Sequence, residues 1–137
     1  MYLIFDTETT GLPQNWKAPL TDFNNWPRCV QLAWQVHDVE GKLVEVKNYI
    51  IKPEGYDIPF NAEKIHGIST GRANKQGMPL AEVLAEFVKD LEKCKFVVGH
   101  NVSFDKSIVG CELLRKEMPN LLTDFPALDT KDDATNY

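Results

Sequence analysis

The sequence has few cysteines, no long hydrophobic run and no excess of basic residues, and each shortage argues against a class of protein. Cys29, Cys94 and Cys111 lie far apart and form no C-x-x-C pair. We therefore expect reduced, partly buried thiols in a cytoplasmic protein rather than a disulfide scaffold or a zinc knuckle. No apolar stretch approaches ~18 residues and no basic segment opens the chain, so neither a transmembrane helix nor a signal peptide is expected.

The charge balance excludes a further class of protein. Fifteen Lys and Arg against 20 Asp and Glu give a net charge of −5, which argues against a protein that coats duplex DNA through a basic face. What the chain does have is 137 residues, of which 43% are hydrophobic and 26% charged. This composition predicts one globular domain over residues 1–137 with a real hydrophobic core.

The hydrophobic pattern predicts a mixed α/β fold. The wholly apolar run at residues 2–5 is typical of a central strand covered on both faces. Six further elements follow from alternation, helical periodicity and turn residues. They are an antiparallel hairpin of strands over 29–37 and 43–51, a helix over 79–93, a short strand over 96–99, a helix over 102–117 and a last strand over 126–129.

Three carboxylates follow or adjoin these elements in a way that suggests a metal site. Asp6 and Glu8 come at the end of the first strand, where alternation points both side chains the same way. Asp105 lies in the first turns of a helix that Asn101 could cap. If the strands over 2–5 and 96–99 are neighbours, the three carboxylates converge, and hard oxygen ligands suit Mg²⁺ or Mn²⁺ rather than zinc.

Each carboxylate also has an ordinary structural explanation at this point. A D-x-E pair occurs by chance in many chains, and Asp6 and Glu8 could form a solvated strand end. Asp105 could be an acidic residue that the helix dipole favours. The residues alone leave both alternatives open.

Two longer motifs and a shorter landmark resemble the DEDD 3′–5′ exonucleases, the family that contains the DNA polymerase III epsilon proofreading subunit. Residues 5–12 read Phe-Asp-Thr-Glu-Thr-Thr-Gly-Leu and are similar to the first family motif. Residues 98–105 read Val-Gly-His-Asn-Val-Ser-Phe-Asp and resemble the second, N-x-x-F-D. Between them, residues 65–68 read Ile-His-Gly-Ile, a third landmark in family order.

The resemblance implies a fold, a cofactor and a set of site residues. The expected fold is ribonuclease H-like, a mixed five-stranded sheet with its first strand central and helices flanking it. Asp6, Glu8 and Asp105 would be the catalytic carboxylates that bind two Mg²⁺ or Mn²⁺ ions. The residues expected to bind the nucleic acid are Thr7, Thr9, Thr10, Gly11, Leu12, His66, Asn101 and Phe104.

The chain also departs from the family pattern. Family members often have Glu five positions before the His, where this chain has Asn61. Their third motif, H-x(4)-D or Y-x(3)-D, supplies a general base and a fourth Asp on a later helix, and no His follows Asp105 here. We therefore expect a truncated exonuclease domain. The remaining candidates for the fourth Asp are Asp124, Asp129, Asp132 and Asp133.

The long connection over residues 12–28 carries Trp16, Phe23 and Trp26. Long loops in compact domains are often functional, and exposed rings could stack on bases. The rings could equally pack the loop onto the sheet. The sequence leaves both alternatives open for each ring.

Two functions fit the whole pattern. The first is a metal-dependent 3′–5′ exonuclease that removes nucleoside 5′-monophosphates from single-stranded 3′ ends of DNA or RNA, with the 137-residue chain itself inactive. The alternative is a non-catalytic nuclease-fold module that binds metal or a DNA polymerase subunit. Two bound Mg²⁺ ions would nearly offset the net charge of −5, so the acidic balance is compatible with nucleic acid. A truncated sheet would also leave apolar surface exposed, which predicts self-association.

Overall fold

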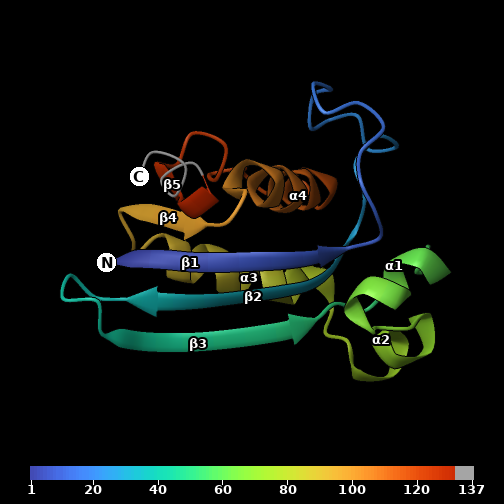
Figure 1. The fold of residues 1–137 in the computed structure, drawn as a ribbon, viewed down its shortest axis with the longest axis horizontal. Coiled ribbons are helices and arrows are strands. Elements are labelled where there is room, and N and C mark those ends of the chain that lie inside the picture. Colours follow the sequence, from blue (N-terminus) through green and yellow to red (C-terminus); the bar gives the residue numbers. More distant parts are fainter. Residues whose placement is uncertain (132–137) are drawn as a thin grey trace.

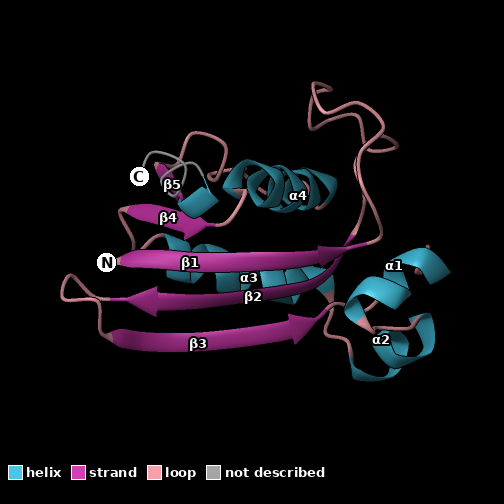
Figure 2. Cartoon of the chain, in the orientation of Figure 1, coloured by secondary structure: helices cyan, strands magenta, loops and turns pink. Residues whose placement is uncertain are grey.

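Five strands form one mixed sheet in the order β3-β2-β1-β4-β5, with β1 at its centre (Figures 1 and 2). This computed structural model describes residues 1–131. β1 pairs antiparallel with β2 and parallel with β4, so the first strand and the 96–99 strand are neighbours, which is the condition set above for the three carboxylates to converge. The elements are β1 (Tyr2–Thr9), β2 (Cys29–His37), β3 (Leu43–Ile50), α1 (Phe60–His66), α2 (Thr70–Gln76), α3 (Leu80–Leu91), β4 (Phe96–Gly99), α4 (Val102–Arg115) and β5 (Ala127–Asp129).

The hairpin of β2 and β3 forms where alternation predicts it. The face of β2 that was predicted to be apolar is buried, and Trp34 at its centre is 1% exposed. Between the strands, the Asp38 side chain accepts hydrogen bonds from the backbone N–H groups of Glu40 and Lys42, both at 2.9 Å. Gly41 takes the positive φ of 81° that the reversal requires. Local turn chemistry therefore fixes the register that places Trp34 in the core.

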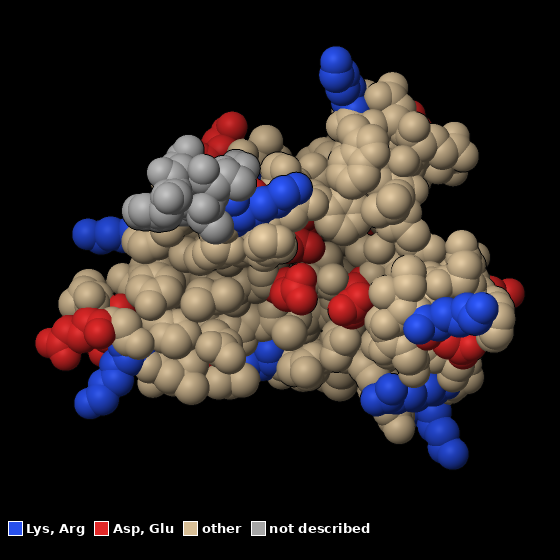
Figure 3. Space-filling model, viewed as in Figure 1, with Lys and Arg blue, Asp and Glu red and all other residues tan. Residues whose placement is uncertain are grey.

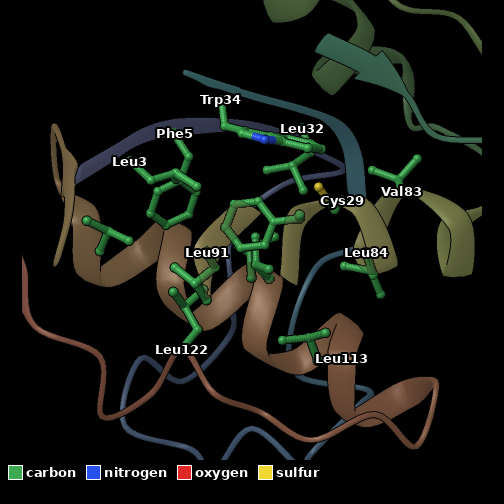
Figure 4. Close-up of a cluster of buried hydrophobic side chains, with 14 of the residues drawn as sticks. Leu3, Phe5, Cys29, Leu32, Trp34, Val83, Leu84, Leu91, Leu113 and Leu122 are labelled. Atoms are coloured by element: carbon green, nitrogen blue, oxygen red, sulfur yellow. The ribbon is translucent and has the colours of Figure 1, made fainter. Parts of the chain in front are cut away.

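The main core lies between the sheet and helices α3 and α4 (Figure 4). Phe87 of α3 contacts Phe5 of β1 and Trp34 of β2, with ring centroids 5.5 and 5.3 Å apart. The Trp34 indole N–H donates to the buried carboxylate of Asp90, also on α3, at 2.8 Å. Pro79 precedes α3 as its N-cap residue. The predicted helix over 79–93 is confirmed, with its ends shortened to Leu80 and Leu91.

Helix α4 carries a carboxylate that is completely buried. Glu112 is 0% exposed, and its oxygens accept hydrogen bonds from Arg28 Nε at 3.1 Å, Arg115 Nη1 at 2.6 Å and the Cys29 backbone N–H at 3.0 Å. Arg115 also donates to the carbonyl oxygens of Phe23 and Trp26 at 2.7 and 2.8 Å. Two cations and a backbone N–H compensate the buried charge, and together they fasten α4 to β2 and to the 12–28 loop.

The expectation that residues 2–5 are covered on both faces is wrong. Along β1, Leu3, Phe5 and Thr7 point into the helix-covered core, whereas Ile4 on the other face is 36% exposed. Val46 of β3, which with Ile4 lines a shallow hollow on that face, is 53% exposed. Within residues 1–131 the sheet therefore has a covered face and an open face, and the open face carries apolar side chains.

Two local features differ from the sequence expectations. Asn101 is the N-cap residue of α4, but its side chain forms no capping hydrogen bond and its φ is +58°. The Asp129 carboxylate caps the helix instead, accepting from the backbone N–H groups of Asn101 and Val102 at 2.9 and 3.1 Å. The short helices α1 and α2 were not predicted, because they bury little more than Ala62 and Ala73 and show no apolar stripe.

The three cysteines are free and buried, which confirms the expectation of unpaired thiols. Burial raises the pKa of the Cys29 thiol, and the negative charge of Glu112 raises it further. No helix in residues 1–131 has the length and apolar content needed to span a membrane.

Replacing Glu112 tests how much the fold depends on its buried charge. We expect Glu112→Ala to lower the free energy of unfolding by roughly 3–5 kcal/mol, because it leaves two guanidinium groups and the Cys29 N–H without their acceptor. Urea denaturation measures the change. Glu54→Ala is the matched control, because Glu54 pairs with Lys116 at the surface and should cost less than about 1 kcal/mol. Equal losses in the two variants would contradict a special role for Glu112.

Candidate active site

The first motif is divided between the two faces of β1. Strand alternation sends Asp6 and Glu8 to the open face, where Asp6 is exposed and Glu8 half-buried. Thr7 points to the helix-covered side, where its hydroxyl donates to Asp105 Oδ1 at 2.6 Å. This bond joins residues that are 98 positions apart and holds the second motif against the first.

Asp105 is a buried carboxylate in an acidic environment. It lies in the first turn of α4 and is 3% exposed. Burial raises the pKa of Asp105 to about 7, the hydrogen bonds from Thr7 lower it, and the negative charges of Asp6 and Glu8 raise it again. Asp6 and Glu8 are therefore near enough to Asp105 for their charges to raise its pKa. Figure 3 shows acidic side chains gathered in the middle of this face, with most basic side chains toward its margins.

A cleft of about 480 Å³ is bounded by three separate segments; Glu8 lines it, whereas Asp6 and Asp105 do not. One wall is the end of β1 and the residues after it, the second is α1 and the third is the start of α4. The lining residues are Thr7, Glu8, Thr9, Thr10, Gly11, Leu12, Asn61, Ala62, Ile65, His66 and Phe104. Seven of the eight residues expected to bind nucleic acid are thus in this cleft.

Asn101 is the exception. It lies in the turn before α4, where its backbone N–H donates to Asp129, and it does not line the cleft. Its left-handed conformation is one that Asn adopts more readily than most residues, so the turn gives it a structural role. Ala62 and Ile65, which sequence reasoning did not select, line the cleft. Ile65 belongs to the 65–68 landmark and Ala62 lies one helical turn before His66, and this spacing was the signal that could have found them.

His66 presents a nitrogen that has no protein partner in residues 1–131. Gly67 ends α1 in the left-handed conformation, with φ 75°, and turns the chain so that the Ile68 N–H donates to His66 Nδ1 at 3.1 Å. Because Nδ1 accepts this bond, a neutral imidazole carries its proton on Nε2. That Nε2 is buried and forms no hydrogen bond with the described residues. A ligand oxygen in the cleft would satisfy it.

The rim of the cleft is apolar and unusually exposed. Two of the residues that line it are largely exposed: Leu12 is 71% exposed and Ile65 is 84% exposed. Single exposed apolar residues are common, but here two from separate segments border the same cleft. Such a rim suits a ligand with flat, apolar faces as well as charged groups.

The loop aromatics do not all behave alike. Trp26 is buried, 5% exposed, and its indole N–H donates to the Pro19 carbonyl oxygen at 3.0 Å, so it packs the loop. Phe23 is 42% exposed and lies under the Arg115 guanidinium. Trp16 is 54% exposed and its ring contacts Phe104, a residue of the cleft wall.

The donor chemistry of the three carboxylates fits Mg²⁺ or Mn²⁺, which prefer hard oxygen ligands. A cation would also relieve the repulsion that contributes to the raised pKa of Asp105. However, in residues 1–131 no three His, Cys, Asp or Glu side chains come close enough together to enclose an ion. The residues therefore fit a divalent cation in kind, while this structure does not bring them into a closed ligand set.

None of the described candidates for a fourth acidic ligand is placed to serve. Asp124 is exposed on the loop before β5. Burial raises the pKa of Asp129, but backbone N–H groups of Lys131, Asn101 and Val102 lower it below its ordinary value overall, because the carboxylate is engaged as a cap. Asp132 and Asp133 lie outside the described residues.

Comparison with known proteins identifies the family. The family model described as "Exonuclease" matches residues 3–133, almost the whole chain. The chain belongs to the exonuclease family.

Individual proteins agree with this assignment. The chain is 31% identical over 136 residues to a DNA polymerase III PolC-type of Streptococcus thermophilus and 30% identical over 135 residues to that of Streptococcus pyogenes. The aligned region is 98% of this chain but only 8% of either polymerase. It also superposes on Escherichia coli exonuclease I in complex with a dT13 oligonucleotide, with a TM-score of 0.78 and 22% identity, over 98% of this chain and 29% of that one. This likeness confirms the ribonuclease H-like fold.

Proposed function

We propose that residues 1–137 belong to a single metal-dependent 3′–5′ exonuclease domain that removes nucleoside 5′-monophosphates from single-stranded 3′ ends. The observation that carries this proposal is the cleft bounded by both family motifs and by His66, which Glu8 lines and whose Thr7 is hydrogen-bonded to Asp105. Membership of the exonuclease family supports the reaction class. The exonuclease I complex with an oligonucleotide supports a single-stranded substrate, and the cytoplasm is the expected compartment.

Each of the chain's own residues would have a separate role in binding the substrate or positioning a carboxylate. The terminal nucleotide would occupy the cleft between α1 and the Thr7–Leu12 segment. His66 Nε2–H would donate to a sugar or phosphate oxygen, because it has no other partner in the described chain. The exposed Leu12 side chain would contact a base face at the rim. Thr7 would keep the Asp105 carboxylate oriented through the 2.6 Å hydrogen bond.

Asp6, Glu8 and Asp105 are the residues that would hold the Mg²⁺ or Mn²⁺ ions. When bound, such ions supply an activated water and neutralise the charge that develops on the phosphate during displacement. The general base remains to be assigned, because no His follows Asp105 in this sequence. For this reason we expect the 137-residue chain alone to be nearly inactive.

A second function is a nuclease-fold module that binds metal or a DNA polymerase partner without turnover. Two observations favour it, namely the open ligand set within residues 1–131 and the lack of a later His. The likeness to PolC-type DNA polymerase III makes a polymerase subunit a reasonable partner and a role in replication proofreading a reasonable context. The substrate of the exonuclease role would be DNA first and RNA second, because these relatives are DNA polymerases.

Metal binding should be detectable in the 137-residue chain. We expect Mn²⁺ to raise the melting temperature by a few degrees, because an ion at ten times its Kd adds about 1.4 kcal/mol to the stability of the folded state. Thermal melts with and without Mn²⁺ measure this. Asp6→Ala should lose the response, and Glu82→Ala, which removes an exposed carboxylate of α3, should keep it. An equal response in wild type and Asp6→Ala would exclude the carboxylates as the site.

Nuclease activity should be measured on the longest form of the protein that its gene encodes, beside the 137-residue chain. With Mg²⁺ or Mn²⁺, the longest form should shorten a 5′-labelled single-stranded oligonucleotide from its free 3′ end and release 5′-monophosphates. Asp6→Ala, Glu8→Ala and Asp105→Ala should each lower the rate by roughly two orders of magnitude or more, since each removes a metal ligand. An intact substrate, or an Asp105→Ala variant as active as wild type, would favour the non-catalytic module.

The open sheet face predicts self-association of the 137-residue chain. Sedimentation velocity at increasing concentrations should show species larger than the monomer, and Val46→Lys should reduce them by placing a charge on that face. Val39→Lys is the matched control, because Val39 is 87% exposed in the turn between β2 and β3, outside the sheet. A strictly monomeric wild type, or equal effects of the two lysines, would contradict this prediction.

A further inference from the structure

The 12–28 loop holds Trp16 outward on a rigidly anchored turn. The Ala18 N–H donates to the Asn15 carbonyl oxygen at 3.3 Å, which places Trp16 and Lys17 at the two central positions of a β-turn. The Asn15 side chain accepts from the Lys17 N–H at 2.9 Å, an Asx turn that stabilises the same reversal. Because the central residues of such a turn project away from the chain ends, Trp16 points outward from the loop.

A buried amide anchors the base of this turn. Asn25, 9% exposed, accepts from the Asn15 N–H at 2.7 Å and donates to the Asn15 carbonyl oxygen at 2.9 Å. Arg115 of α4 then fixes the following stretch by its bonds to the Phe23 and Trp26 carbonyl oxygens. Two side-chain networks thus hold the loop in one position, so the exposure of Trp16 is a property of an ordered segment.

The Trp16 ring borders the cleft without entering it. Its centroid is 5.4 Å from that of Phe104, with the planes inclined at 49°, and Phe104 forms part of the cleft wall. Trp16 itself is not among the lining residues. One side of its ring therefore rests on Phe104, and about half of its surface remains open to solvent. A ligand that fills the cleft and extends past Phe104 would meet this ring next.

We propose that Trp16 is a stacking platform for a base of the single strand just outside the cleft, upstream of the terminal nucleotide. The inference rests on the proposed function and adds a contact to it. Base–aromatic stacking suits a nuclease that must hold any sequence, because every base has a flat π-face. It also suits this acidic site, since stacking attracts the strand without requiring a positive charge.

Equilibrium binding tests the proposal on the 137-residue chain, with Ca²⁺ in place of Mg²⁺ to limit cleavage. The probe is a 5′-fluorescein-labelled dT6 with a free 3′ end, followed by anisotropy. Trp16→Leu should weaken binding about five-fold or more, the range of one lost stacking contact, whereas Trp16→Phe should retain most of it. Unlabelled dTMP, which fills only the cleft, should compete equally well with wild type and Trp16→Leu.

Phe23→Leu is the matched control, because Phe23 is a partly exposed aromatic residue of the same loop whose ring faces Arg115. It should leave dT6 binding unchanged. Thermal melts of each variant establish that the fold is intact. A dT6 series with one abasic residue at successive positions from the 3′ end gives a double-mutant cycle. At the stacked position, removing the base should abolish the effect of Trp16→Leu, whereas removal of the 3′-terminal base should not.

Tryptophan emission gives an independent measurement. Trp26 and Trp34 are 5% and 1% exposed, so Trp16, at 54%, is the tryptophan that bound nucleic acid can reach. Unlabelled dT6 should quench the emission of wild type, and Trp16→Phe should lose that quenching while still binding dT6.

The outcomes separate this inference from the function on which it rests. Wild-type binding of dT6 that Trp16→Leu leaves unchanged would overturn the stacking proposal and retain the exonuclease proposal. An equal loss in Phe23→Leu, or a parallel loss of dTMP competition, would overturn it too, because the loop would then act only as a whole. A wild type that binds no oligonucleotide would overturn both.

Discussion

The buried carboxylate of Glu112 determines how the site is assembled. It connects α4 to the start of β2 through Arg28 and the Cys29 N–H, and to the 12–28 loop through Arg115. Asp105 is on the same helix, and Trp16 is in the loop that Arg115 holds. A buried ion network adds little net stability compared with apolar packing, but removing one partner is costly. We interpret this network as the constraint that fixes the relative positions of the second motif and the loop.

The alternation of β1 explains why a motif of consecutive residues can serve two purposes. Asp6 and Glu8 reach the open face, while Thr7 between them reaches the opposite side and bonds to Asp105. The hydroxyl group is therefore as necessary to the arrangement as the carboxylates. Negative charge accumulates at this point, and burial together with that charge raises the pKa of Asp105. The buried acids Glu112 and Asp90 differ in this respect, because each is paired with a cation, Arg28 and Lys47 respectively.

Much of the fold could be predicted from the sequence, because periodicity reports burial directly. Apolar residues alternate from Val30 to Val36 and recur with helical spacing from Leu80 to Leu91, because one side of each element faces the core. The α1 and α2 helices could not be predicted this way, since they are held by a few alanine contacts and by caps at Ser69 and Gly67. The Asn101 cap failed for a different reason: Asp129, 28 residues later, accepts from the backbone N–H groups of Asn101 and Val102 and holds the turn in which Asn101 takes its left-handed conformation. Long-range competition of this kind leaves no local pattern.

The candidate site shows the same division. Motif residues could be selected from the sequence, and seven of the eight expected nucleic-acid contacts line one cleft. The roles of the three loop aromatics could not be separated, because composition treats them alike. Their different roles depend on the contacts that each one makes: the buried Trp26 donates to the Pro19 carbonyl oxygen, the Phe23 ring lies under the Arg115 guanidinium, and the Asn15–Asn25 hydrogen bonds anchor the turn that exposes Trp16. An exposed ring on an anchored turn retains little conformational freedom to lose on binding, which makes it an effective contact for a flexible single strand.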